Sequence, residues 1–170
     1  MILHAGLVAL RLGGRWRGAL ITGPSGAGKS DLALRALAAG LRLVADDRVV
    51  VWASGGAPYG RAPPPLAGLI EARGHGVGPE SPLAFAEIIL VARCAGEAES
   101  IERMPDPEVE TVAGLAVPLA RFDPLQASAP AKLRRALERL GAGPQEAYLG
   151  ASRGGGGRAG SGEYPLRPRQ

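Results

Sequence analysis

The sequence predicts one α/β domain in which strands outnumber helices. Several short apolar runs, bounded by Gly, Pro or Asp, have the length and pattern of strands. Two further segments repeat apolar residues at the spacing of a helix face. One of these follows a strand directly after a glycine-rich loop, as in phosphate-binding α/β folds. A chain of 170 residues has the length of about one ordinary domain.

The expected elements are read from apolar periodicity and from turn residues. The expected strands are 2–12, 19–22, 41–45, 49–53, the start of 68–76, 88–92 and 115–119. The expected helices are 30–39 and 131–140. Gly40 is placed to end the first helix in a left-handed conformation, and Leu133, Leu137 and Leu140 form the buried stripe of the second. We expect loops at 13–18 and in the proline-bounded acidic segment after Met104.

Charge and glycine are concentrated near the carboxyl end of the chain. The formal net charge is +4, and residues 150–170 contribute +3 of it through Arg153, Arg158, Arg167, Arg169 and Glu163. The rest of the chain is therefore almost neutral, which disfavours nucleic acid as a partner. The Gly/Arg-rich composition of 150–170 predicts a disordered tail behind a domain that spans residues 1–145.

Several other classes of protein are excluded by composition. The single cysteine, Cys94, excludes a disulfide within the chain and a zinc site made of several thiolates. It lies in an apolar run, so we expect it to be buried. The chain has no apolar stretch long enough to cross a membrane and no recognisable secretion signal at its start. We therefore expect a cytoplasmic protein with no membrane partner.

The most specific motif is a phosphate-binding loop. Gly23-Pro24-Ser25-Gly26-Ala27-Gly28-Lys29-Ser30 fits the pattern G-x-x-x-x-G-K-[ST], between an expected strand and an expected helix. The glycines let backbone N–H groups surround an anion, and the helix start adds its positive end. Lys29 would reach the β- and γ-phosphates, and the Ser30 hydroxyl would bind Mg²⁺. This motif predicts binding of a nucleoside triphosphate together with Mg²⁺.

Carboxylates after the loop are expected to distinguish a kinase from other phosphate-loop proteins. Asp46 and Asp47 close an expected strand, where one could face the metal while the other accepts a proton from a hydroxyl. A solvated turn is the alternative for this pair. Glu71 stands near Arg73 and Gly74, and a surface ion pair is the alternative for these residues.

These motifs together resemble the catalytic domain of bacterial HPr kinase/phosphorylase. The phosphate loop is followed by Leu43-Val44-Ala45-Asp46-Asp47-Arg48-Val49, by Ala62-Pro63-Pro64-Pro65-Leu66, and by a segment running from Leu69 to Val77. The last segment contains the pattern E-x-R-G-x-G in Glu71, Arg73, Gly74 and Gly76. The resemblance covers about residues 2–140. It implies a mixed-sheet kinase domain with the fold shared by phosphoenolpyruvate carboxykinase.

The resemblance also implies a reaction and roles for residues. The reaction is ATP-dependent phosphorylation of a serine in HPr, the small phosphocarrier of the sugar phosphotransferase system. Lys29 would bind phosphate, Ser30 and Glu71 would bind Mg²⁺, and Asp47 would be the base, supported by Asp46. His4 would be an active-site residue, and Arg103 would lie near the transferred phosphoryl group. Arg73, Gly74 and Gly76 would form a loop that meets phosphates or the partner.

The chain departs from the family pattern in ways that alter these expectations. His4 is four residues from the start, so we expect a short form consisting of the C-terminal catalytic domain alone. The family's loop for dephosphorylation is represented only by residues 117–123, so the resemblance supports the kinase reaction more than phosphorolysis. The family forms hexamers, which is the oligomer that the resemblance implies. A small-molecule kinase and a nucleotide-binding regulator without turnover remain the alternative functions.

Overall fold

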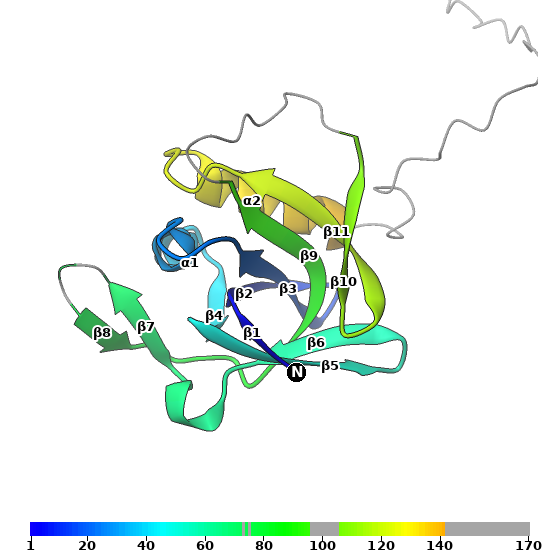
Figure 1. Cartoon of the computed structure of the whole chain (residues 1–170), viewed down its shortest axis with the longest axis horizontal. Coiled ribbons are helices and arrows are strands. Elements are labelled where there is room, and N and C mark those ends of the chain that lie inside the picture. Colours follow the sequence, from blue (N-terminus) through cyan, green and yellow to red (C-terminus); the bar gives the residue numbers. More distant parts are fainter. Residues whose placement is uncertain (73, 75, 96–105, 142–170) are drawn as a thin grey trace, which may run out of the picture.

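The computed structural model describes residues 1–72, 74, 76–95 and 106–141, and over these ranges it shows a curled mixed sheet with two helices on one face (Figure 1). The predicted α/β class is therefore confirmed. Predictions for Arg73, Arg103 and the tail at 150–170 lie outside the described residues. In the part of the chain that is described, no helix has the length and apolarity needed to span a membrane.

The described part of the chain contains eleven strands, two α-helices and one 3₁₀ turn. The strands are β1 (Ile2–His4), β2 (Gly6–Leu12), β3 (Arg15–Thr22), β4 (Arg42–Ala45), β5 (Arg48–Ser54), β6 (Ala57–Arg61), β7 (Leu69–Ala72), β8 (Gly76–Pro79), β9 (Ala86–Cys94), β10 (Glu108–Val112) and β11 (Leu115–Phe122). The helices are α1 (Lys29–Ala38), the 3₁₀ turn η1 (Pro64–Leu66) and α2 (Ala129–Gly141).

The large sheet is organised around β9. Its path runs β1-β5-β6-β9-β3-β2-β4, and β11, which pairs with β10, joins the end of β9. Because β3 and β11 both pair with β9 in parallel, the carboxyl ends of these three strands lie at one edge of the sheet. Open α/β sheets bind ligands outside the carboxyl ends of their strands. The small hairpin of β7 and β8 stands beside this sheet (Figure 1).

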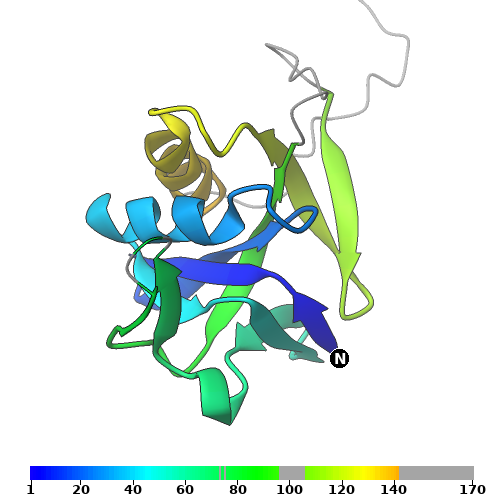
Figure 2. The same ribbon diagram turned by 60° about the vertical axis from the view of Figure 1, so that its left-hand side comes forward.

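Alternating side chains of the central strands divide the core between two faces. In β3, Ala19 and Ile21 face the layer that contains α1 and α2, whereas Leu20 faces the inside of the curl. Figure 2 shows the two helices together over one face of the sheet, and the hairpin of β10 and β11 continues the sheet beyond β9. The stripe of Leu133, Leu137 and Leu140 is buried, as the sequence predicts. Arg134 Nη1 also donates to the Ala39 carbonyl at 2.8 Å, which joins α2 to the end of α1.

The helix boundaries agree with the prediction to within one or two residues, but several strand predictions need correction. The predicted strand 2–12 breaks at Ala5, because its first part pairs with β5 and its second with β3 and β4. The predicted loop 13–18 shrinks to the turn Gly13-Gly14, with φ of 56° and 78°. Such positive φ values suit a two-residue hairpin turn.

Three strands are absent from the prediction. β6 contains Pro58 and Gly60, both poor strand formers, yet a Cβ at Gly60 would lie 2.6 Å from Leu7 Cδ2. Close packing inside the curl therefore selects glycine there. β8 pairs with β7 in the segment predicted as a glycine-rich loop. β10 begins at Glu108, within the segment predicted as an acidic loop, and its pairing with β11 overrides the proline-bounded pattern.

Candidate functional site

The phosphate-binding loop lies between β3 and α1, at the sheet edge where three parallel strands end. Gly23, Gly26 and Gly28 have φ values of 141°, 80° and 90°, which residues other than glycine rarely adopt. At Gly23 a Cβ would also lie 2.8 Å from the Cys94 carbonyl oxygen. The loop therefore begins in close contact with the end of β9, and only glycine fits there.

Lys29 is folded back over this loop. Its side chain is buried, with 8% of its surface exposed. The ammonium group donates to the carbonyl oxygens of Gly23 and Pro24, at 3.1 and 2.9 Å. An ammonium has three protons, so these bonds fix its position and leave one proton for an anion in the loop. The first turn of α1 thus places a fixed positive charge beside the backbone N–H groups.

Asp46 connects three elements of the site. It is 5% exposed, and its carboxylate accepts hydrogen bonds from the Ser30 hydroxyl at 3.0 Å and from the Glu71 N–H at 3.1 Å. A register shift between β2 and β4 leaves Val44 as an extra residue, so Val44 and Ala45 both face the inside of the curl. Bulges of this kind commonly redirect a side chain next to a functional site. Here the bulge lies two residues before Asp46.

Asp47 has a different environment although it is the next residue. Its φ is 62°, an uncommon value for a residue with a side chain. Its Oδ1 lies 2.9 Å from His4 Nε2, and the two side chains are 58% and 54% exposed. Its carbonyl accepts from the Ala5 N–H at 3.1 Å, at the break between β1 and β2. This break therefore brings His4 beside the carboxylate.

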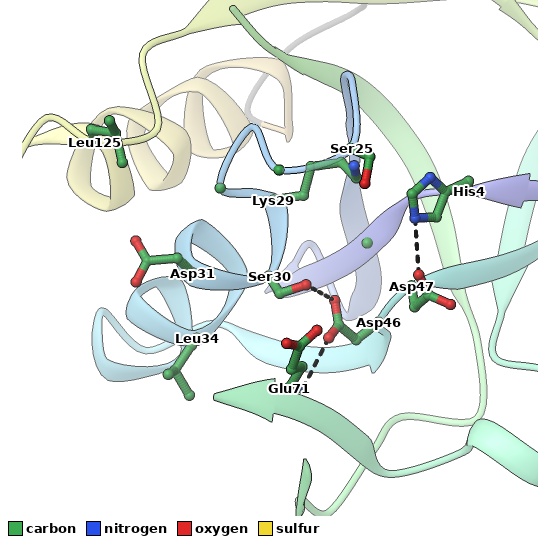
Figure 3. Close-up of a pocket in the computed structure, with 13 residues that line it drawn as sticks. His4, Ser25, Lys29, Ser30, Asp31, Leu34, Asp46, Asp47, Glu71 and Leu125 are labelled. Atoms are coloured by element: carbon green, nitrogen blue, oxygen red, sulfur yellow. Dashed lines mark hydrogen bonds and ion pairs between the residues drawn. The ribbon is translucent and has the colours of Figure 1, made fainter. Parts of the chain in front are cut away.

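These residues line one pocket of about 380 Å³ (Figure 3). Nine of its lining residues are predicted site residues: His4, Ser25, Gly26, Gly28, Lys29, Ser30, Asp46, Asp47 and Glu71. Gly23, Pro24 and Ala27 belong to the loop without lining the pocket, and two of them hold Lys29 through their carbonyls. Gly74 and Gly76 lie on or beside the β7–β8 hairpin, away from the pocket lining. Arg73 and Arg103 lie outside the described residues.

Four pocket residues are missing from the sequence-based prediction: Gly6, Asp31, Leu34 and Leu125. Asp31 and Leu34 follow the loop on α1, so helical spacing places them near it. Gly6 follows the break between β1 and β2. Leu125 comes from the segment between β11 and α2, almost a hundred residues after the loop, and no local pattern in the sequence identifies it.

Cys94 lies beneath the loop and is buried, as its apolar surroundings predict. Burial raises the pKa of its thiol from 9.0 to about 11, against a smaller opposing effect from the charge of Lys29. The thiol is therefore protonated at neutral pH, which is the state of a packing residue rather than a nucleophile.

The donor set fits Mg²⁺ bound together with a nucleotide. The Ser30 hydroxyl and the carboxylates of Asp46 and Glu71 line the same pocket. Within the described ranges, no group of three or more His, Cys, Asp or Glu side chains could hold a metal ion. Mg²⁺ commonly takes one or two protein ligands and completes its shell with phosphate oxygens and water. The residues present agree with that mode of binding.

Comparisons with known proteins point to one family. Residues 3–78 match the model of the HPr Serine kinase C-terminal domain. HPr kinase/phosphorylase of Lacticaseibacillus casei (strain BL23) is 51% identical over 61 residues, which cover 35% of this chain and 19% of that protein. HPr kinase/phosphorylase of Clostridium kluyveri is 50% identical over 60 residues, covering 35% and 20%. The chain thus spans about a fifth of the length of these curated relatives.

A solved structure extends the likeness over most of the chain. The Hpr(Ser) kinase/phosphatase of Coxiella burnetii superposes with a TM-score of 0.69 at 23% sequence identity, covering 84% of this chain and 99% of that one. At this identity the likeness concerns the fold. The motifs, the family model and the fold agree, and they confirm that this chain resembles the C-terminal domain of HPr kinase/phosphorylase, as its sequence predicts.

Proposed function

We propose that this domain, comprising residues 1–145, is an ATP- and Mg²⁺-dependent serine kinase whose acceptor is an HPr-like phosphocarrier protein. The observation that carries the proposal is the exposed Asp47 carboxylate, held by His4 in the same pocket as Lys29 and Ser30. A carboxylate within reach of a phosphate site, and open to solvent, can meet the hydroxyl of a second protein.

Nucleotide binding rests on the phosphate loop. The backbone N–H groups of the loop and the Lys29 ammonium would hold the phosphates, as fixed donors that need no rearrangement. Ser30 and Glu71 would hold Mg²⁺, which when bound neutralises charge on the phosphates. The Asp46 carboxylate holds the Ser30 hydroxyl and the backbone N–H of Glu71 in place by accepting a hydrogen bond from each.

The transfer step is assigned to Asp47 and His4. The serine oxygen of the acceptor forms a bond to the γ-phosphorus as the bond to the β-phosphate oxygen breaks, and ADP leaves. Asp47 takes the proton of the serine hydroxyl. His4 orients the carboxylate through the 2.9 Å contact with Oδ1, while Oδ2, which lies 3.7 Å from Arg48 Nε, is the oxygen that we assign to the acceptor proton. Arg103, outside the described residues, would stabilise charge on the transferred group.

A protein acceptor agrees with the openness of this end of the pocket. His4 and Asp47 are both more than half exposed. A serine on a loop of another protein could therefore approach Asp47 without opening the described part of this chain. The similar proteins of Lacticaseibacillus casei and Clostridium kluyveri are HPr kinase/phosphorylases, which supports an HPr-like protein as the acceptor.

The test is transfer of labelled γ-phosphate from Mg²⁺–ATP to the HPr-like protein of the same organism. Lys29→Ala and Asp47→Asn should abolish labelling of the acceptor serine. Lys132→Ala changes the other lysine of the chain, which lies exposed on α2, and Asp106→Asn changes an exposed aspartate. Both should leave labelling unchanged. ATP binding without any transfer would instead support a regulator without turnover.

A further inference from the structure

Leu125 is an exposed leucine in the wall of the pocket that the proposed reaction leaves without a role. It is 70% exposed, among the most exposed large apolar side chains of the described residues. It lines the pocket together with Gly26, Gly28 and Asp31. An exposed apolar side chain needs no explanation when it stands alone on a surface, but one in the wall of a polar phosphate site calls for a physical reason.

The backbone around Leu125 is held at three points. Its own N–H donates to Asp123 Oδ1 at 3.0 Å. Arg35, on α1, donates to the carbonyls on both sides of it, Pro124 and Gln126, the latter at 3.2 Å. Arg35 also pairs with Asp31 at 2.8 Å. The segment that carries Leu125 is therefore tied to the first helix of the phosphate site, while the leucine side chain stays in solvent.

The same segment touches the phosphate loop directly. A Cβ added at Gly28 would lie 3.3 Å from Pro124 Cγ and 3.8 Å from Leu125 Cδ2. The φ of 90° favours glycine at position 28, and the neighbouring proline leaves little room for a side chain there. Because the backbone of this segment is held beside Gly28, the Leu125 side chain can contact a ligand that extends outward from the loop.

The pocket has two ends, and Leu125 lies at the end away from the chemistry. Figure 3 shows Leu125 on one side of the loop and His4 with Asp47 on the other, with Lys29 between them. The γ-phosphate of a bound nucleotide must face Asp47 for transfer, so the nucleoside must extend the opposite way. Leu125 also follows β11, two strands across from β3 in the parallel part of the sheet. A ligand crossing the carboxyl ends of these strands meets that segment.

We propose that Leu125 forms the apolar wall against which the nucleobase of the nucleoside triphosphate lies, and that Arg35 is the residue that positions it. This inference rests on the proposed function, because it needs the nucleotide that the kinase would use. The faces of a purine ring are apolar, and burying Leu125 against one removes apolar surface from water. Fixing the leucine before the ligand arrives reduces the entropy lost on binding.

Calorimetric binding to the full chain can separate the nucleobase from the phosphates. Mg²⁺–ATP carries both parts, whereas inorganic triphosphate with Mg²⁺ carries only the phosphates. Leu125→Ala should weaken ATP binding about tenfold, equivalent to about 1.4 kcal/mol, and leave triphosphate binding within twofold. Leu125→Met keeps an apolar side chain of similar length and should restore ATP binding to within threefold of the original. Val109→Ala, at an exposed valine on β10, is the matched control and should change neither.

Arg35 provides an independent arm of the same experiment. Arg35→Ala removes the donors to Pro124 and Gln126, so it should also weaken ATP binding while sparing triphosphate. If Arg35 only supported the fold, Arg35→Ala would weaken the binding of ATP and of triphosphate by the same factor.

The outcomes separate this inference from the function on which it rests. If Leu125→Ala leaves ATP binding unchanged, or weakens ATP and triphosphate equally, Leu125 does not contact the nucleobase although the kinase proposal stands. If the unaltered chain binds neither ligand, the proposed function is overturned and this inference with it. Selective loss of ATP affinity, rescued by Met, supports the inference.

Discussion

The floor and the rim of the pocket beside the phosphate-binding loop differ in how far their side chains are buried. The floor consists of Lys29 and Asp46, which line the pocket and are 8% and 5% exposed, and of Cys94, which packs behind the loop against Gly23 and is 1% exposed. The rim, formed by His4, Asp47 and Leu125, is more than half exposed at each position. Polar groups in the floor are held by hydrogen bonds, since burying them without partners would destabilise the fold. The rim is free to meet ligands, so substitutions there should change function more than stability.

Asp47→Asn should give the largest effect and should act on catalysis alone. We expect phosphate transfer to fall about a thousandfold, because a general base contributes roughly 10² to 10⁴ in rate. The unfolding midpoint in urea should shift little, since an exposed ion pair contributes about 0 to 1 kcal/mol. Single-turnover transfer and urea unfolding on the same preparation measure both. A large loss of stability would show that Asp47 belongs to the floor.

The rate at which the Cys94 thiol reacts with a labelling reagent should report its burial behind the loop. Burial raises its pKa to about 11 from 9.0, so below pH 9 the native thiolate is about a hundredfold scarcer than in the unfolded chain. Labelling with a disulfide reagent at pH 8 should be at least that much slower in the native protein than in urea.

The same shift predicts a dependence of stability on pH. A raised pKa in the folded state favours the protonated thiol, so this contribution is complete below pH 9 and is lost as the pH rises toward 11. Unfolding measured from pH 8 to 11 should show this decline, and Cys94→Ala should remove it. A native labelling rate within tenfold of the unfolded rate would contradict the burial.

Asp46→Ala should destabilise the domain by about 2 kcal/mol. The substitution leaves the Ser30 hydroxyl and the Glu71 N–H without their acceptor, and a hydrogen bond to a charged group contributes about 1.5 to 3 kcal/mol net. Water that enters the pocket should replace part of the two bonds. Urea unfolding measures the change, and Asp106→Ala at an exposed position is the control. An unchanged midpoint would mean that water replaces the carboxylate without loss.

Two glycine substitutions should produce the smallest changes in stability, and they separate backbone strain from function. Ala113 has φ of 50° in the turn between β10 and β11, so Ala113→Gly should stabilise the domain by about 0.5 to 1 kcal/mol without changing transfer. Asp47→Gly should stabilise it less, because aspartate tolerates positive φ better and its pairing with His4 is lost. It should nevertheless abolish transfer. Equal activity of the two variants would contradict the role of Asp47.

The helices, most of the strands and the glycine-rich loop with the phosphate-binding motif follow from the sequence without the structure. These features depend on neighbours along the chain: the spacing of leucines on α2, the glycines of residues 23–28, and the lysine and serine that follow them. The motifs also predicted that Asp46, Asp47 and Glu71 belong to one site, and all three line the pocket.

The different environments of these residues follow from the tertiary structure. The bulge at Val44 and the positive φ at Asp47 bury one aspartate and expose the next, although both occupy the same motif. Glycine is needed in β6 because Leu7 packs against Gly60 inside the curl, and Leu125 reaches the loop because the segment after β11 packs against Gly28. These outcomes depend on contacts between residues distant in the chain, which no local pattern of side chains encodes.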